Sequence, residues 1–156
     1  SDLDGGAKYE RKQRFLAGFG REVNRNRLAA MRKGREFLLV GDLNIAHTEF
    51  DVTNWRAARP MDGFLPEDRA WFDSVLGRRR LVDVVRQVYG DRPGPLTWWS
   101  WAGESFVKDV GWRIDHQLAS PALARRARGR HLIAELGHAA LDVAEALGDL
   151  LGRAQS

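Results

Sequence analysis

The sequence contains no cysteine, which excludes disulfide bonds and thiolate metal sites and fits a reducing compartment. No apolar run approaches the roughly 20 residues that a membrane-spanning helix requires. A secretory signal peptide is not visible either, and the first residue, Ser1, is not a methionine. From these absences we expect a cytoplasmic protein without a membrane partner, of which this sequence is a fragment.

Acidic residues are nearly as numerous as basic ones, 21 against 25, and the formal net charge is +4. The basic excess is concentrated near the N-terminus, because ten basic residues lie between Lys8 and Arg35 against only Glu10 and Glu22. Such a run is typical of a solvated helix face, although it also suits a polyanionic partner. With 156 residues, of which 44% are hydrophobic, the chain is expected to form one globular domain or a large part of one.

Apolar periodicity predicts alternating helices and strands, so we expect an α/β fold, with α+β as the alternative. Phe15, Phe19 and Val23 have the four-residue spacing of a helix, and the polar residues 24–27 interrupt this pattern. The expected elements are a loop over 1–7, a helix over 8–33 that residues 24–27 could divide, a buried strand over 36–40, a polar connection over 45–63, helices over 66–76 and 81–89, strands over 97–101 and 112–119, and a helix over 139–151.

Gly41-Asp42-Leu43-Asn44 follows the apolar run of the first predicted strand. Side chains two residues apart on a strand point the same way, so Asp42 and Asn44 are delivered to one place. A carboxylate beside an amide suits a hard cation and a phosphate oxygen. The alternative is an ordinary turn at the end of the strand, in which either side chain caps local backbone groups.

Residues 112–119 form the second polar pattern. On a strand, Arg113, Asp115 and Gln117 would share one face, and a carboxylate there could orient Asn44 or a catalytic base. The alternative is an Arg113–Asp115 ion pair on a half-exposed strand. His116 would point to the opposite face from Asp115, so we expect it to be packed rather than to form a catalytic dyad.

Three tryptophans lie within five residues in Thr97-Trp98-Trp99-Ser100-Trp101. On a strand, Trp99 and Trp101 share the face that we expect to be core. Trp98 lies on the other face, where it could stack on a sugar or a base, and core packing is the alternative.

Together these segments resemble exodeoxyribonuclease III, the apurinic/apyrimidinic endonuclease family of the endonuclease/exonuclease/phosphatase superfamily. The resemblance covers residues 8–126, and residues 127–156 form an atypical Ala/Leu-rich tail, so 1–156 is expected to be a single partial domain. The matching stretches occur in the family's order and are Gly41-Asp42-Leu43-Asn44-Ile45-Ala46-His47-Thr48, Phe64-Leu65-Pro66-Glu67-Asp68-Arg69-Ala70-Trp71, Leu81-Val82-Asp83, Thr97-Trp98-Trp99-Ser100-Trp101 and Gly111-Trp112-Arg113-Ile114-Asp115.

This resemblance implies a role for each candidate residue. Asp42 is similar to the aspartate that positions or deprotonates the attacking water, and Asn44 to the asparagine that stabilises the transition state. Both would lie at the metal, which is Mg²⁺ with Mn²⁺ as an alternative. Asp115 is similar to the aspartate that orients its neighbours, and Trp98 to the aromatic residue that lines the abasic-sugar pocket.

The implied fold is part of a four-layer α/β sandwich, and the implied partner is double-stranded DNA with abasic sites or 3′ ends. The complete protein would be a monomer that acts in DNA repair as a Mg²⁺-dependent phosphodiesterase, both 3′-to-5′ exonuclease and abasic-site endonuclease. An early asparagine, a metal-binding glutamate, an active-site tyrosine and a final Ser-Asp-His-Ala-Pro motif, which the family carries, have no counterpart here. We therefore expect the 156 residues alone to be inactive. The alternatives are a superfamily phosphoesterase acting on phospholipid or phosphoinositide, and a non-catalytic remnant that binds DNA or packs with a partner.

Overall fold

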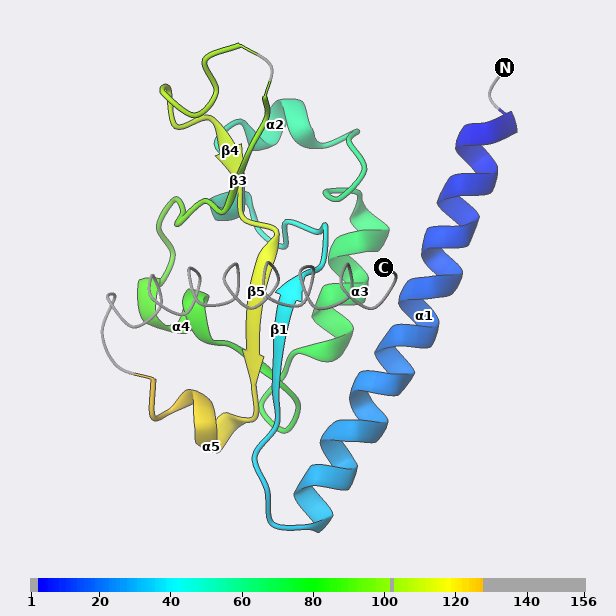
Figure 1. Ribbon diagram of the computed structural model, residues 1–156, viewed down its shortest axis with the longest axis vertical. Helices are drawn as coiled ribbons and strands as arrows, with labels where there is room; N and C mark the ends of the chain where they lie inside the picture. Colours follow the sequence, from blue (N-terminus) through cyan, green and yellow to red (C-terminus); the bar gives the residue numbers. More distant parts are fainter. Residues whose placement is uncertain (1–2, 102, 128–156) are drawn as a thin grey trace, which may run out of the picture.

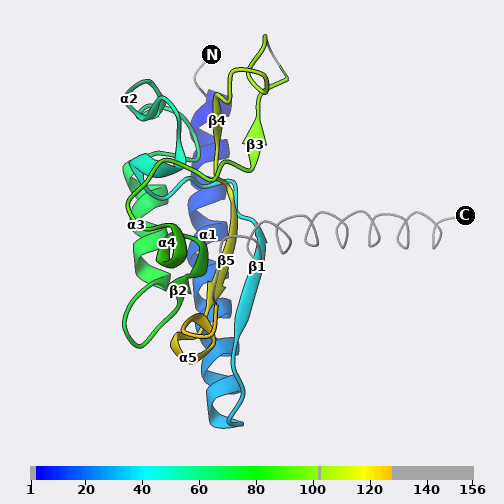
Figure 2. The same ribbon diagram turned by 90° about the vertical axis from the view of Figure 1, so that its left-hand side faces the viewer.

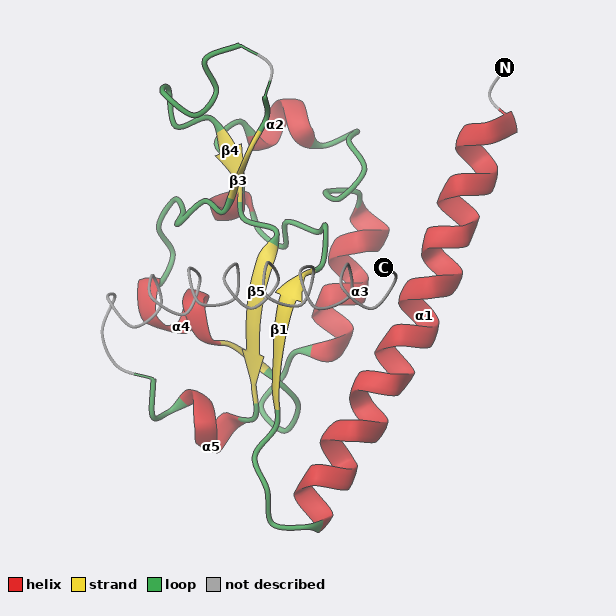
Figure 3. Cartoon of the chain, viewed as in Figure 1, coloured by secondary structure: helices red, strands yellow, loops and turns green. Residues whose placement is uncertain are grey.

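The computed structural model describes residues 3–101 and 103–127 (Figure 1). Helices and strands alternate along the described chain, which confirms the α/β class (Figure 3). The elements are α1 (Leu3–Arg32), β1 (Leu38–Asp42), the 3₁₀ helix η1 (Glu49–Asp51), α2 (Trp55–Ala58), α3 (Pro66–Val75), β2 (Val82–Asp83), α4 (Val84–Tyr89), β3 (Trp98–Trp99), β4 (Gly111–Trp112), β5 (Asp115–Ala119) and α5 (Pro121–Ala124). The helix predicted over 139–151 and the tail lie outside the described residues.

The sheet that carries the site has the strand order β1-β5-β2, with β5 antiparallel to both neighbours. Its register places Leu38 opposite Ala119 and Asp42 opposite Asp115. A separate two-stranded ladder joins β3 and β4. The prediction of one strand over 112–119 is wrong. Trp112 belongs to β4, which pairs with β3, and Asp115–Ala119 form β5 in the other sheet. Between them the N–H of Arg113 donates to Asp51 O over 2.7 Å.

Helix α1 is continuous, so the predicted loop over 1–7 is wrong for residues 3–7, and of the two possibilities left open for residues 24–27 the undivided helix is the one observed. Extending an existing helix by one residue costs little compared with nucleating it, and this allows the glycine-containing start to be helical. The asparagine side chains bond along the helix instead of competing with its backbone. Asn26 Nδ2 donates to Glu22 Oε1 over 2.9 Å, and Arg27 Nη2 donates to Asn24 Oδ1 over 2.8 Å.

The predicted helix over 66–76 is confirmed as α3, with Pro66 in its first turn. The segment over 81–89 begins as the short strand β2, and its helix starts only at Val84. Asp83 is the N-cap of α4 and accepts a hydrogen bond from the N–H of Arg86 over 3.0 Å. The strand predicted over 97–101 is shorter in the structure, where β3 contains only Trp98 and Trp99.

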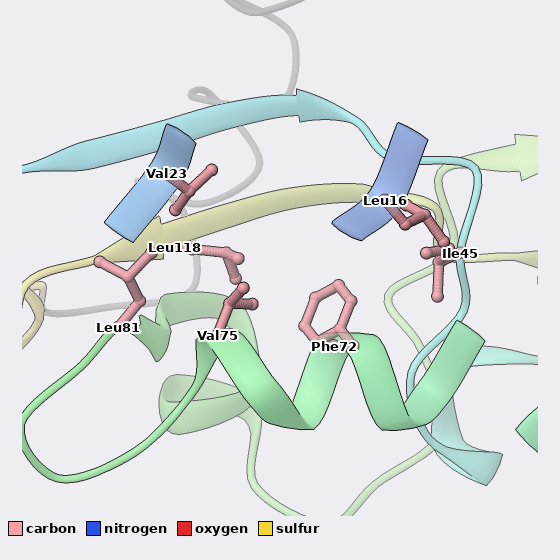
Figure 4. Packing of buried hydrophobic residues seen from close by; sticks show 7 residues of the cluster. All are labelled: Leu16, Val23, Ile45, Phe72, Val75, Leu81 and Leu118. Carbon is pink, nitrogen blue, oxygen red and sulfur yellow. The ribbon is translucent and has the colours of Figure 1, made fainter. Parts of the chain in front are cut away.

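The main core fills the space between the sheet and the helices α1 and α3 (Figure 4). Seven buried hydrophobic residues form it, and they are Leu16, Val23, Ile45, Phe72, Val75, Leu81 and Leu118. Each large side chain buried in this way contributes roughly 1.5–3 kcal/mol relative to exposure. The core therefore fixes β1 and β5 against α3, and with them the polar residues at their ends.

The outward side chains of β1 are open to solvent. Leu38 is 51% exposed and Val40 43% exposed, while α3 and α4 lie on the opposite side of β1 and β5 (Figure 2). Asp42 follows Val40 by two residues, so its side chain points to this open face. Among the helices of the described chain, none combines the length and the apolar character needed to cross a membrane.

Candidate active site

Asp42 and Asn44 lie together at the end of β1, as predicted. The backbone N–H of Asn44 donates to Asp42 Oδ1 over 2.7 Å, and Asn44 Nδ2 donates to Asp42 Oδ2 over 3.2 Å. Asn44 has a φ of 50°, a left-handed conformation that asparagine tolerates better than most residues. Both side chains are exposed. The carboxylate thus caps a local turn and at the same time remains open to solvent.

Asp115 is brought to the same place by strand pairing. It lies directly opposite Asp42 in the β1–β5 register, and the N–H of Leu43 continues the ladder by donating to Ile114 O over 3.0 Å. Directly opposite residues of antiparallel strands project from the same face, with Cβ atoms about 5 Å apart. Two carboxylates therefore gather beside one amide, an arrangement of like charges that a cation would stabilise.

Trp98 lies next to this group through Thr97. The hydroxyl of Thr97 accepts hydrogen bonds from the N–H groups of Ile114 and Asp115, over 3.1 Å and 3.2 Å. Trp98 follows Thr97 directly, pairs with Trp112 in the β3–β4 ladder and is 42% exposed. Its exposure leaves a ring surface for a ligand.

The core expectation for Trp101 is wrong, since this side chain is 99% exposed. Strand β3 ends at Trp99, so the two-residue alternation does not reach Trp101. Trp99 is half-buried, and its indole Nε1 donates to Asp109 Oδ1 over 3.0 Å.

The segment that follows Asn44 is fixed by two contacts. His116 Nε2 lies 2.7 Å from Ile45 O, and the N–H of Ala46 donates to Gly63 O over 2.8 Å. His116 is 1% exposed, which confirms that it is packed. Gly63 has a φ of +90°, and a Cβ added there would lie 2.7 Å from Asn44 O. Only glycine therefore fits at this approach to Asn44.

Arg113 is buried and is bound by two carboxylates. Its Nε donates to Asp51 Oδ1 over 2.7 Å, and its Nη2 donates to Asp83 Oδ2 over 2.6 Å. The guanidinium of Arg86 also pairs with Asp51. The alternative of an exposed Arg113–Asp115 pair is therefore wrong: Arg113 does not share the outward face of Asp115, because the regular strand starts only after it.

These buried charges shift one another's pKa values. Burial alone would raise the pKa of Asp83, but the neighbouring His116 and the charge of Arg113 lower it well below its usual range. Burial would likewise raise the pKa of Asp51, and Arg113 and Arg86 lower it. The pKa of Arg113 is raised, since the two carboxylates outweigh its burial. His116 Nδ1 lies 3.9 Å from Asp83 Oδ2, which is beyond hydrogen-bond range, so the charge of Arg113, whose Nη2 lies 2.6 Å from Asp83 Oδ2, is the main cause of the lowered pKa of Asp83.

Sequence reasoning assigned no role to Asp51, Asp83 or Thr97. One signal was available, because Asp83 is the only charged residue in the apolar run Leu81-Val82-Asp83-Val84-Val85. A carboxylate in such a run requires a buried partner. Asp51 and Thr97 have no comparable local signal, since their roles depend on segments far away in the sequence.

The side chains at this end of the sheet are of the kind that binds a hard cation. Asp42, Asn44 and Asp115 supply only oxygen ligands, and Mg²⁺ is commonly held by one or two carboxylates, with water and phosphate oxygens filling the remaining positions. Over residues 3–101 and 103–127, no group of three or more His, Cys, Asp or Glu side chains has the geometry to hold a metal ion. The described residues thus fit an open site that needs further ligands. That Asp42 and Asn44 bind the metal ion remains a prediction.

The fold and the site define an α/β protein whose exposed strand-end oxygens suit a cation and a phosphate ester. A profile of the Endonuclease/Exonuclease/phosphatase family matches residues 7–136, and the chain belongs to this family. The resemblance drawn from the motifs is thereby confirmed.

Relatives of known name agree with this assignment. The chain is 39% identical over 98 residues to an exodeoxyribonuclease of Streptococcus pneumoniae, a match that covers 62% of this chain and 35% of the relative. It is 37% identical over 89 residues to the DNA repair nuclease APEX1 of Danio rerio, covering 57% of this chain and 28% of the relative. The chain thus spans about a third of the length of the curated relatives it matches.

Among solved structures, a 3′-5′ exonuclease from Neisseria meningitidis superposes with a TM-score of 0.68 and 29% identity. The superposition covers 78% of this chain and 45% of the exonuclease. The same mixed helix-and-strand arrangement is therefore shared with a larger protein.

Proposed function

We propose that this chain carries part of the active site of a divalent-metal-dependent DNA phosphodiesterase, a 3′-to-5′ exonuclease and abasic-site endonuclease of DNA repair. One observation carries the proposal: Asp42 lies directly opposite Asp115 at the open sheet edge, with Asn44 hydrogen-bonded to Asp42. The names of the relatives support DNA as the substrate, and nucleases of this family generally depend on a divalent metal.

The chemistry assigns a separate task to each side chain. The Asp42 carboxylate orients or deprotonates the attacking water, while the Asn44 amide donates to a phosphate oxygen as negative charge develops on it. Asp115 holds its neighbours in place from the opposite strand. A bound Mg²⁺, held by Asp42 and Asn44, would neutralise phosphate charge.

Two further features favour DNA over a lipid phosphate. Trp98 is 42% exposed and follows Thr97, whose hydroxyl accepts a hydrogen bond from the N–H of Asp115, so the Trp98 ring offers a surface on which a sugar or base can stack. The basic side chains of α1 suit the polyanionic backbone of DNA.

The test replaces the matching segment of the Streptococcus pneumoniae relative with residues 8–126 of this chain, so that the missing ligands come from the host. We expect the chimera to nick duplex DNA at a single abasic site only with a divalent metal, and to leave phosphoinositide vesicles unchanged. Asp42→Asn should lower the nicking rate by about 100-fold or more.

Asp73→Asn serves as the matched control, because Asp73 is an exposed carboxylate that pairs with His47. This variant should keep the activity of the chimera. A chimera that folds, by circular dichroism and gel filtration, yet fails to nick, or keeps full activity after Asp42→Asn, would refute the proposal.

A further inference from the structure

A groove between α1 and α3 gathers three arginines at a distance from the candidate active site. It has a volume of about 340 Å³ and is lined by Arg21 and Arg27 of α1 and by Arg80, which follows α3. The segment between α3 and β2 lies near the start of β1, at the opposite end of this strand from Asp42 (Figure 1). The groove therefore belongs to a different region from the strand-end carboxylates.

The three guanidiniums lack counter-charges. In the described part of the chain none of them forms an ion pair. Glu22, on the same helix, pairs with Arg25 instead. Like charges that line one groove repel one another, and an anion in that groove removes the repulsion.

Neutral acceptors hold two of these side chains in position. Arg27 Nη1 donates to Arg79 O over 3.0 Å and its Nη2 to Asn24 Oδ1 over 2.8 Å. Arg80 donates to the carbonyl of Ser74. Because each acceptor is uncharged, the positive charge is retained, and the remaining N–H donors are oriented before a ligand arrives.

The floor of the groove is apolar. Val23, Val75 and Leu81 are buried there, with exposed fractions of 4%, 7% and 1%. Trp71 forms part of the wall and is fixed by its Nε1, which donates to Leu16 O over 2.6 Å. The groove thus combines an apolar surface with a cationic rim, at the small end of the usual size range of ligand pockets.

We propose that this groove binds a small phosphate ester with an apolar or planar body, of the size of a nucleoside monophosphate. The phosphate would lie against the arginines, because guanidinium groups make paired, charge-assisted hydrogen bonds to phosphate oxygens. The body would lie over Val23 and Val75, beside Trp71. This proposal is independent of catalysis at Asp42.

Calorimetric titration of the intact 156-residue chain tests the site, with deoxyadenosine monophosphate, inorganic phosphate and a short DNA duplex as separate probes. We expect saturable one-to-one binding of the nucleotide that is tighter than binding of inorganic phosphate. Arg21→Gln with Arg80→Gln should weaken it about tenfold or more, since charge-assisted hydrogen bonds are lost. The matched control, Arg11→Gln with Arg14→Gln, removes the same charge from exposed positions of α1 and should leave the affinity within about twofold.

The proposal would be overturned by the absence of saturable nucleotide binding, by an equal loss in the control variant, or by binding of the duplex alone through Arg21 and Arg80. Circular dichroism and urea unfolding establish that the variants are folded. If the double variant is destabilised, Arg21→Gln alone repeats the comparison, because the side chain of Arg21 makes no hydrogen bond to the described residues. An unchanged affinity in that variant would also count against the site.

Discussion

His116 Nε2 lies 2.7 Å from the carbonyl oxygen of Ile45, the residue that follows Asn44. This contact joins the middle strand of the sheet to the segment that leaves β1. His116 is also packed against Phe72, with ring centroids 4.5 Å apart. The position of Asn44 therefore depends on a buried imidazole that takes no part in the open site itself.

Replacing this imidazole tests that dependence. His116→Phe keeps a ring in the core but leaves Ile45 O without its buried partner, and we expect a loss of about 1–3 kcal/mol in the free energy of unfolding. Hydrogen exchange at Ile45 and Ala46 should accelerate more than at α3. Uniform acceleration, or none, would contradict a local role for His116.

Arg113→Met should destabilise the chain strongly, because it leaves Asp51 and Asp83 buried without their shared cation. The expected loss is about 3–5 kcal/mol, measured by urea unfolding. Arg125→Met, on the exposed end of α5, is the control and should stay within about 0.5 kcal/mol of the parent. A loss of equal size in both variants would show that the buried pairs contribute little.

The lowered pKa values of Asp51 and Asp83 predict how the free energy of unfolding changes in acid. The pKa values of Asp51 and Asp83 are lower in the folded chain than their unfolded values near about 4. Their stabilisation is therefore fully present above that pH and is lost as the pH falls through the folded pKa values. Urea unfolding at a series of pH values should show stability decreasing below about pH 4.

Asp83→Asn should flatten this acid dependence, since it removes one of the two shifted groups. Asp73→Asn removes an exposed carboxylate and should keep the parental slope. If both variants retain the same slope, other groups govern the acid response.

Gly63→Ala tests the close approach to Asn44. The added methyl group would meet Asn44 O at 2.7 Å and would also force a positive φ on alanine, which costs about 1–2 kcal/mol by itself. Gly34→Ala shares the positive φ but has no atom within 4 Å, so it isolates the conformational cost. We expect Gly63→Ala to be clearly the more destabilising in urea, and equal effects would argue against the contact.

The 156-residue chain by itself should not nick abasic duplex DNA in the presence of Mg²⁺. Asp42, Asn44 and Asp115 are a partial catalytic set, and losing members of a catalytic unit commonly lowers rates by several orders of magnitude. A gel assay over a series of enzyme concentrations measures this. Robust nicking that disappears in Asp42→Ala would show that the three side chains suffice.

Local patterns predicted those parts of the fold that depend on neighbours in the sequence. The proline and acidic residues at Pro66-Glu67-Asp68 located the start of α3, and the apolar run before Gly41 located β1 to within two residues. The proximity of Asp42 and Asn44 followed from alternation along one strand. The strand pattern suggested that Asp115 could orient Asn44, and the family resemblance supported this, but the pairing of Asp115 with Asp42 is not visible in a single segment.

Other features depend on distant partners and were not predictable from local patterns. Arg113 was given an exposed partner two residues away, whereas its partners are Asp51 and Asp83, which lie 62 and 30 residues earlier. Trp101 was assigned to the core by alternation, but its strand ends after two residues. In both cases the backbone departs from a regular strand, and the simple two-residue pattern fails there.

The buried Asp51–Arg113–Asp83 cluster also sets an order of events during synthesis of the chain. Both carboxylates precede Arg113 in the chain. Asp51 can pair with Arg86 before Arg113 is synthesised, but Asp83 cannot be buried at low cost until its partner Arg113 has emerged. The part of the domain that encloses Asp83 therefore closes only once Arg113 is present.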